Sequence, residues 1–242
     1  MSEDFWRSGV VLRHGWLGAA ECDGYVAAVR ELECSDGLPR IERTSPGRPL
    51  CYKVVDGRRI ESVIRDIDIL SQRVIAELED VCGTRFVPIS DPVAARNVNV
   101  TPPGGTYRWH YDRNAVTTIV YLNEVKGGET ELFPNYRLLF RDGRCNGRLR
   151  RSLDLLLRLP PVRFLFGRRR LVVPSKGLLV IMRGDHTLHS VRRVDGDEDR
   201  MTIVLGWDFP GAHHARFALD RYLYETTAVR GDPNYLESAP ST

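Results

Sequence analysis

The spacing of apolar residues changes at about residue 86, and this change constrains the fold more than any other feature of the chain. Before it, apolar residues recur every three or four positions over residues 18–33 and 60–81, which predicts two amphipathic helices, the second ended by Gly83. From Phe86 onward, short alternating runs are separated by Gly and Pro, as in a β-sandwich or barrel. We therefore expect a mainly β fold whose N-terminal helices pack on the outer face of one sheet.

The length and composition favour a single domain. The 242 residues are 42% hydrophobic, which supports a substantial core. We divide the expected domain into a helical N-terminal support at residues 1–85, a β core at 86–210 and a C-terminal extension at 211–242. A basic insertion interrupts the core at about residues 135–170.

The sequence carries no signal for secretion or for a membrane span. It has no N-terminal apolar signal segment and no apolar run long enough to cross a bilayer. Its five cysteines are odd in number and lack CxxC spacing, which indicates reduced thiols rather than a disulfide framework or a zinc ribbon. These observations predict a cytoplasmic protein.

A His-x-Asp pair stands inside the expected β region. His110 and Asp112 come just before residues 117–122, a β-branched and aromatic stretch that predicts a strand. In an extended segment, residues i and i+2 point to the same face, so the two side chains can converge. Together with the distant His189 they supply two imidazoles and one carboxylate, the ligand set that holds non-haem Fe(II) and leaves positions open. We expect an iron site that supports oxygen chemistry.

Arg200 follows His189 after two valines and a Gly/Asp-rich cluster. This order predicts a strand, a tight turn and a second strand, which returns Arg200 to the neighbourhood of His189. A planar guanidinium suits bidentate capture of a carboxylate, and Thr202 shares its face of the strand. Iron ligands beside such a clamp predict a co-substrate with a carboxylate at one end and a metal-chelating group at the other. A 2-oxo diacid fits that description.

In these motifs the sequence resembles the iron- and 2-oxoglutarate-dependent dioxygenases, most closely the prolyl-hydroxylase-like and phytanoyl-hydroxylase-like branches. The resemblance covers about residues 94–207. Each motif is weak alone, but the ordered set is specific. In chain order it comprises His110-x-Asp112, Tyr121-Leu122-Asn123-Glu124, Gly127-Gly128-Glu129-Thr130 with Phe133, Val173-Pro174-Ser175-Lys176-Gly177, His189-x-Val191 with Val194-x-Gly196, and Arg200 with Trp207.

The resemblance implies a double-stranded β-helix core, the jelly-roll or cupin-like fold, with Fe(II), 2-oxoglutarate and O2 as cofactors. It makes His110, Asp112 and His189 the metal ligands. It makes Arg200 the partner of the distal carboxylate of 2-oxoglutarate, with Thr202 as the hydroxyl companion. The chain departs from the family in the long spacing between Asp112 and His189, which contains the basic insertion.

Further polar residues are candidates for contact with the cofactor or the substrate. Asn97 and Asn99 project to one face of the expected strand; we assign Asn99 to the cofactor and Asn97 to the substrate. The alternative is that they bond to loop backbone.

The Tyr121 hydroxyl is a candidate for contact with 2-oxoglutarate; the alternative is that Tyr121 is a buried core tyrosine. Arg113 is a candidate for an acidic or polar group of the substrate, against a place in a solvated turn. His186 competes with His189, but it lacks the motif that follows His189, and we expect it to pack or hydrogen-bond nearby.

The insertion at residues 135–170 contains eleven arginines, no lysine and two aspartates, a net charge of +9, so the rest of the chain carries about −6. Its apolar residues 153–159 predict a short helix stopped by Pro160 and Pro161, and residues 162–166 alternate like a strand. We expect the insertion to lie over or beside the mouth of the active site.

Three interpretations of the insertion remain open. It could receive an acidic substrate or partner, such as a phosphorylated metabolite or a carrier protein with a tethered substrate. It could form a basic amphipathic surface for a membrane or nucleic acid, with nucleic acid least favoured because lysine and a stacking platform are absent. It could instead pack its apolar residues on the core or on a second subunit, as in a homodimer.

We expect an oxygenase that hydroxylates a C–H bond of a small molecule, such as a specialised metabolite, and releases succinate and CO2. Desaturation and cyclisation would use the same residues. One alternative is a prolyl-type hydroxylase that acts on a protein. Another is a non-catalytic or zinc-binding jelly roll, against which Arg200 argues, since a simple zinc site needs no carboxylate clamp.

Overall fold

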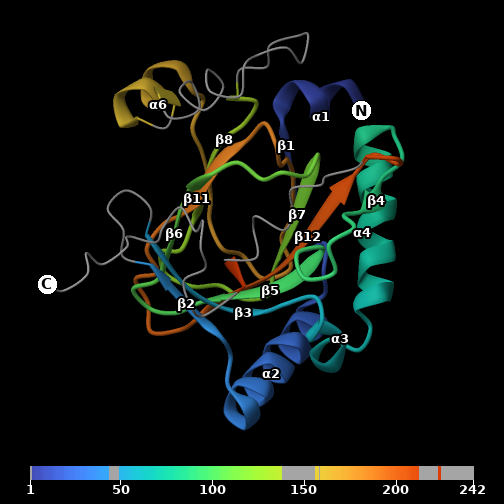
Figure 1. Ribbon diagram of the computed structural model, residues 1–242, viewed down its shortest axis with the longest axis vertical. Coiled ribbons are helices and arrows are strands. Elements are labelled where there is room, and N and C mark those ends of the chain that lie inside the picture. The colour runs from blue at the N-terminus through green and yellow to red at the C-terminus, as the bar shows by residue number, and fades with distance from the viewer. Residues whose placement is uncertain (1, 44–48, 138–155, 158, 213–222, 225–242) are drawn as a thin grey trace, which may run out of the picture.

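The computed structural model describes residues 2–43, 49–137, 156–157, 159–212 and 223–224 (Figure 1). The helices are α1 Ser2–Ser8, α2 Ala19–Asp36, α3 Ile60–Val63, α4 Ile67–Cys82 and α6 Pro160–Phe166. The strands are β1 Val10–Arg13, β2 Arg40–Arg43, β3 Leu50–Val55, β4 Val87–Pro88, β5 Arg96–Thr101, β6 Thr106–His110, β7 Val116–Tyr121, β8 Thr130–Phe133, β9 Arg170–Val172, β10 Leu179–Arg183, β11 Leu188–Val191 and β12 Arg200–Asp208.

The strands form one antiparallel sheet in the order β1-β10-β7-β12-β5-β3-β6-β11-β8-β9, with β2 beside β3 and β4 beside β12. The sheet curls on itself. The Arg200 guanidinium on β12 donates a hydrogen bond to the Thr130 hydroxyl on β8 at 3.0 Å, although β5, β3, β6 and β11 lie between these strands in the order. Two halves of the sheet therefore face each other, and the predicted jelly-roll core with flanking helices is confirmed (Figure 1).

The N-terminal helices cover one face of this sheet, as predicted. Leu70, Val74 and Leu78 of α4 are fully buried in the same apolar cluster as Val98 and Val100 of β5. Because side chains alternate along a strand, the intervening asparagines of β5 point to the opposite, interior face. The helices thus support the back of the strands, and the polar residues face the inside.

The predicted helix at 60–81 is divided into α3 and α4, with a break at residues 64–66. Ile64 and Ile67 are both buried, so the apolar pattern continues through the break. The Tyr25 hydroxyl on α2 donates to the carboxylate of Asp66 at 2.7 Å, a tertiary contact that periodicity cannot reveal. Gly83 ends α4 with a φ of 67°, the left-handed conformation that favours glycine, so this stop signal is confirmed.

The prediction of a strand at residues 162–166 is wrong, because Pro160–Phe166 form α6. Pro160 and Pro161 occupy the first two helical positions. Proline is favoured there because its missing N–H would have no partner in the helix. Leu156 and Leu157 are helical and Leu159 is not, so one helix ends before Pro160, as predicted, and the two prolines begin the next. Most of the helix expected at 153–159 lies outside the described residues.

Among the helices that the structure describes, none combines the length and apolar character needed to cross a membrane.

Candidate metal centre

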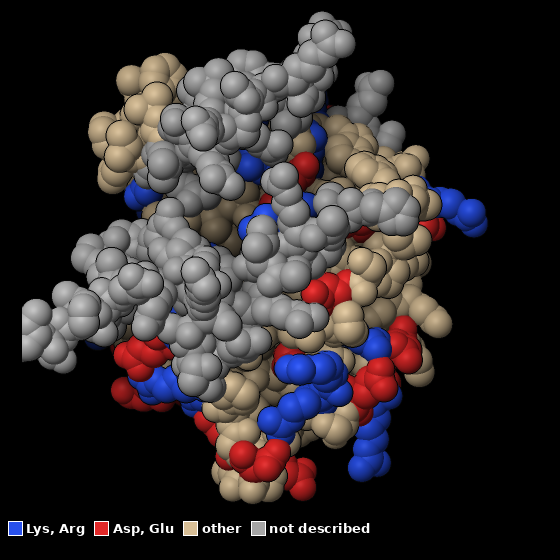
Figure 2. Space-filling model, viewed as in Figure 1, with Lys and Arg blue, Asp and Glu red and all other residues tan. Residues whose placement is uncertain are grey.

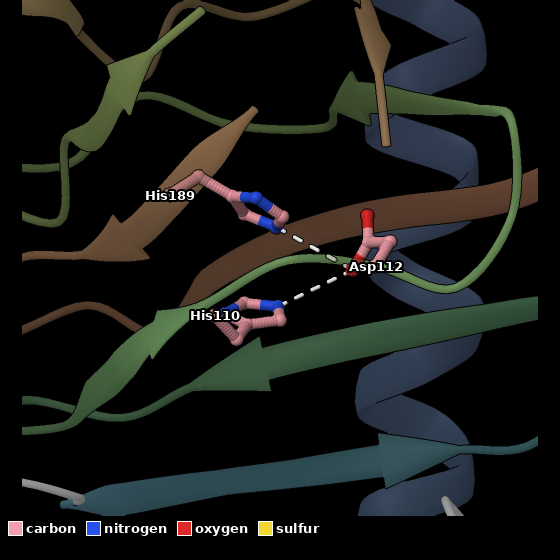
Figure 3. A group of neighbouring side chains, drawn as sticks. All are labelled: His110, Asp112 and His189. Atoms are coloured by element: carbon pink, nitrogen blue, oxygen red, sulfur yellow. Dashed lines mark ion pairs between the residues drawn. The ribbon is translucent and has the colours of Figure 1, made fainter. Parts of the chain in front are cut away.

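Pairing of β6 with β11 brings the two predicted histidines together. His189 lies directly opposite His110 in the register, and their ring centroids are 4.0 Å apart. Asp112 follows β6 by two residues, and its Oδ1 lies 3.4 Å from His110 Nε2 and 3.6 Å from His189 Nε2 (Figure 3). One ligand atom from each residue lies within 4.8 Å of the others. The three candidate ligands therefore converge, as the sequence predicted.

Backbone carbonyl groups orient both imidazoles. His110 Nδ1 lies 2.9 Å from the carbonyl of Arg108, and His189 Nδ1 lies 3.0 Å from the carbonyl of Thr187. A proton on each Nδ1 satisfies these bonds and leaves the lone pair of each Nε2 directed at the centre. This is the tautomer that a metal-binding histidine needs.

Asp112 is held from two sides. The Thr117 hydroxyl donates to its Oδ2 at 2.5 Å, and its own backbone N–H donates to the Gly184 carbonyl at 3.0 Å. A Cβ at Gly184 would lie 2.7 Å from the Asn114 carbonyl and 3.1 Å from Asp112 Cβ, so only glycine permits this approach. Oδ1 is left facing the two imidazoles.

The local electrostatics favour the protonation states that bind metal. Burial raises the pKa of Asp112, but the adjacent His189 and His110 and the hydrogen bond from Thr117 outweigh it, so the pKa lies below its ordinary value. Burial, followed by repulsion from His110, lowers the pKa of His189 to about 4. At neutral pH the site thus offers a carboxylate and a neutral imidazole.

Arg200 forms a second cluster inside the barrel. It is buried, its Nη2 donates to Thr130 Oγ1 at 3.0 Å, its Nη1 lies 3.5 Å from Thr202 Oγ1, and its guanidinium lies 4.8 Å from the Tyr121 ring centroid. Its Nε has no hydrogen-bond partner, and no carboxylate in the described part of the chain pairs with it. A buried cation without a counter-charge is costly, so the cluster is suited to an anion supplied from outside the chain.

Thr130 is a residue of this cluster that the sequence did not predict. It belongs to the Gly-Gly-Glu-Thr motif of the family resemblance, but the residue type alone does not indicate a contact with Arg200. Its hydroxyl bonds to both Arg200 and the Tyr121 hydroxyl. Tyr121 is fully buried, as in the interpretation of a core tyrosine, and its ring also lies beside Arg200; its contact with 2-oxoglutarate stays a prediction.

The two asparagines of β5 bond to side chains rather than to loop backbone. Asn99 lies opposite Thr202 in the register, and its Nδ2 donates to Asn97 Oδ1 at 3.0 Å. Asn97 in turn donates to the Tyr224 hydroxyl at 3.3 Å. Asn99 therefore adjoins the Arg200 cluster, while Asn97 connects it to a described part of the C-terminal extension.

The other two candidates lie outside these clusters. Arg113 is exposed after Asp112, and its role toward a substrate stays a prediction. His186 is buried and its Nδ1 bonds to Asp185, in agreement with the expectation that it would hydrogen-bond nearby.

The described end of the insertion packs on the outer face of the strands that carry the histidines. Arg163 of α6 stacks on Trp109 with 4.1 Å from its guanidinium carbon to the ring centroid, and Phe164 meets Phe133 at 5.9 Å. Trp109 precedes His110 on β6, so the two side chains point to opposite faces. The expected position of the insertion over or beside the mouth of the active site stays a prediction, and residues 138–155 and 158 lie outside the described ranges.

Residues 96–207 match the model of the 2OG-Fe(II) oxygenase superfamily. No curated protein matches the chain. Among solved structures, the non-haem α-ketoglutarate-dependent carbocyclase SnoK from nogalamycin biosynthesis aligns with a TM-score of 0.65 at 18% identity, covering 91% of this chain and 89% of that one. The epimerase SnoN from the same biosynthesis aligns with a TM-score of 0.64 at 18% identity, covering 86% and 81%. A Pseudomonas putida prolyl-4-hydroxylase aligns with a TM-score of 0.55 at 18% identity, covering 87% and 97%.

At these identities the structural likeness shows a shared fold, and the family match covers the segment that contains both clusters. Through residues 96–207 the chain is similar to the 2OG-Fe(II) oxygenase superfamily, and it is a non-haem iron enzyme of the class that depends on Fe(II), 2-oxoglutarate and dioxygen.

Proposed function

We propose that the protein hydroxylates a C–H bond of a small-molecule substrate and converts 2-oxoglutarate to succinate and CO2. One observation carries the proposal: the converging ligand atoms of His110, Asp112 and His189 share a barrel interior with Arg200, a buried cation without a counter-charge among the described residues. A metal site alone does not explain that cation, but a metal-chelating diacid does.

The donor set fits Fe(II). The Nε2 atoms of His110 and His189 and Oδ1 of Asp112 would hold the metal, because all three are directed at one point. Two imidazoles and one carboxylate leave further positions for exchangeable ligands. When bound, Fe(II) with 2-oxoglutarate and dioxygen supplies the oxidising chemistry.

The protein's own residues would hold and orient the co-substrate. Arg200 would bind the distal carboxylate of 2-oxoglutarate, and the Thr130 and Thr202 hydroxyls fix the plane of its guanidinium. Thr117 keeps Oδ2 of Asp112 occupied, so that Oδ1 is the atom directed at the metal. The burial of His189, Arg200 and Thr202 excludes bulk water from this part of the interior.

The proposal of a small-molecule substrate is supported by the position of residues 223 and 224, which lie beside Asn97 and Tyr52. Tyr224 contacts Asn97, and the Tyr52 hydroxyl donates to the carbonyl of Leu223, so these two residues of the C-terminal extension lie against the strands near the site. We infer that they leave less room for an extended peptide. SnoK and SnoN carry names from the biosynthesis of a small molecule, nogalamycin. The second candidate is a peptidyl hydroxylase, the activity named for the P. putida relative.

Anaerobic titration of the purified protein with Fe(II) and then 2-oxoglutarate would test the proposal. We expect the weak visible charge-transfer band of a metal-chelated 2-oxo acid. His189→Ala should abolish the band and Arg200→Ala should weaken it, whereas His14→Ala and Arg85→Ala, both exposed residues, should leave it unchanged. Tight metal binding without a band in the unaltered protein would contradict the proposal.

A further inference from the structure

A second surface of the protein is built from α6 and the residues that follow it. Seven of the ten exposed large apolar side chains in the described chain lie between residues 156 and 173, and this is the α6 surface: Leu156, Leu159, Phe164, Leu165, Phe166, Leu171 and Val173. Leu165 and Phe166 are 76% and 72% exposed. Such clustering, unlike apolar residues scattered singly, marks a surface that contacts something else.

Helix α6 packs on the sheet through Arg163 and Gly167 and leaves Leu165 and Phe166 exposed. Arg163 stacks on Trp109, and a Cβ at Gly167 would lie 2.4 Å from the Phe133 ring, so α6 is seated closely on the strands beneath. Leu165 and Phe166 extend away from that seat. Figure 1 shows α6 projecting beyond β8 and β11, and Figure 2 shows a convex, largely uncharged prominence at the same place. The apolar end is thus an exposed protrusion rather than a groove.

Positive charge surrounds this protrusion. The described residues between 156 and 173 include Arg163, Arg168, Arg169 and Arg170 and no acidic residue. Arg169 pairs with Glu131, but no carboxylate in the described ranges pairs with Arg168 or Arg170. These two arginines line a cavity of about 330 Å³ that Phe166 also borders, together with Arg7, whose guanidinium pairs with Asp4. A cationic recess therefore lies directly beside the apolar protrusion.

The combination limits the possible occupants. Two copies of the chain meeting through this surface by a two-fold axis would set arginines against arginines, which is unfavourable. Nucleic acid would use the arginines but leave the apolar side chains without a role. A convex apolar end flanked by cations matches the way interfacial helices enter the boundary between headgroups and acyl chains of anionic membranes.

We propose that the α6 surface binds an anionic lipid surface. Phe164, Leu165 and Phe166 insert at the boundary of the acyl chains, while Arg168 and Arg170 bind lipid phosphates at the adjoining recess. The seat of α6 on the outer face of β6 and β8 leaves the metal ligands facing the opposite side of the strands. Attachment and oxidation therefore use separate faces, and the attachment does not depend on the proposed reaction.

Co-sedimentation with vesicles tests this directly. We expect the protein to bind vesicles of phosphatidylcholine with phosphatidylglycerol, to bind pure phosphatidylcholine vesicles weakly, and to lose binding as salt is raised. The double variant Leu165→Ser/Phe166→Ser should reduce binding roughly tenfold or more. Arg168→Glu/Arg170→Glu should remove the preference for the anionic lipid.

Matched controls use exposed residues outside the α6 surface. Ile69→Ser is a single apolar substitution at a side chain that is 60% exposed, and Arg65→Glu/Arg85→Glu reverses two exposed charges elsewhere. Both should bind vesicles like the unaltered protein. Circular dichroism and Fe(II) binding would establish that each variant is folded.

Three results would overturn the proposal. One is the absence of binding to the mixed vesicles by the folded, unaltered protein. Another is binding that both α6 variants retain, which would place the contact elsewhere. The third is a dimer in light scattering that Leu165→Ser/Phe166→Ser abolishes, which would assign the surface to a second copy. Soluble glycerol phosphate should not displace the protein from vesicles; full displacement would indicate a site for a free phosphate and would also contradict the proposal.

Discussion

On one side of β6 and β11 lie His110 and His189, and on the other lie Trp109 and Leu188. The inner residues are oriented by hydrogen bonds to backbone carbonyls, whereas the outer ones pack in an apolar cluster with Phe133. Because successive side chains of a strand point to opposite faces, the same two strands serve both environments. We therefore expect that substitutions on the inner face change the chemistry, and substitutions on the outer face change the packing, independently of each other.

The largest expected effect comes from removing an inner ligand. His189→Ala should reduce 2-oxoglutarate turnover by about a thousandfold or more, since one of three ligands is lost and the iron position is no longer defined. Anaerobic calorimetry with Fe(II) and an assay of succinate would measure it. An unaltered affinity for Fe(II) in the folded variant would show that His189 is not a ligand.

A substitution in the Arg200 cluster should have a smaller effect on activity than the loss of a metal ligand. Arg200→Ala should raise the KM for 2-oxoglutarate by about a hundredfold, because the distal carboxylate loses its charged partner, with Fe(II) affinity retained. The substitution breaks no ion pair, because Arg200 has no acidic partner in the described chain. We therefore expect no loss of stability of the ligand-free protein of the size that breaking a buried ion pair causes. Thermal unfolding with and without 2-oxoglutarate would separate the two effects. A fall in Fe(II) affinity equal to the rise in KM would contradict this division.

Removal of the Thr117 hydroxyl, which bonds to the carboxylate of Asp112, should have a still smaller effect on Fe(II) binding. Thr117→Val removes the hydrogen bond to Asp112 Oδ2 and should weaken Fe(II) binding by about tenfold, as is usual for groups that orient a metal ligand. Thr106→Val, which loses a hydroxyl bonded to the Val191 carbonyl, is the matched control. Equal affinities for Fe(II) in the two variants would show that Thr117 does not orient the ligand.

The smallest effect on chemistry is expected on the outer face. Trp109→Leu should cost about 1 to 2 kcal/mol of stability, because the contact with Arg163 and part of the packing against Phe133 are lost. Fe(II) affinity should stay within about twofold if the two faces are independent. Chemical denaturation and metal titration of the same variant would test this, and a large loss of affinity would show that the faces are coupled.

Much of the site could be predicted because its signals are local. The two-residue spacing of His110 and Asp112 and the strand–turn–strand pattern before Arg200 each follow from backbone geometry over a few residues. Helix α2 could likewise be predicted from its periodicity, and the end of α4 could be predicted from Gly83, where a left-handed residue is required. The family resemblance added the roles of these residues, not their positions in the chain.

The remainder depended on contacts between distant segments. Thr130 joins Arg200 only because the sheet curls, and the break before α4 accompanies a contact between Tyr25 and Asp66. The prolines at the start of α6 are compatible with either a stop or a start, and packing on Trp109 and Phe133 accompanies the helix that forms. Periodicity therefore determined which side chains share a face. Only the tertiary structure decided which face is the interior, because that depends on strand pairing between residues far apart in the chain.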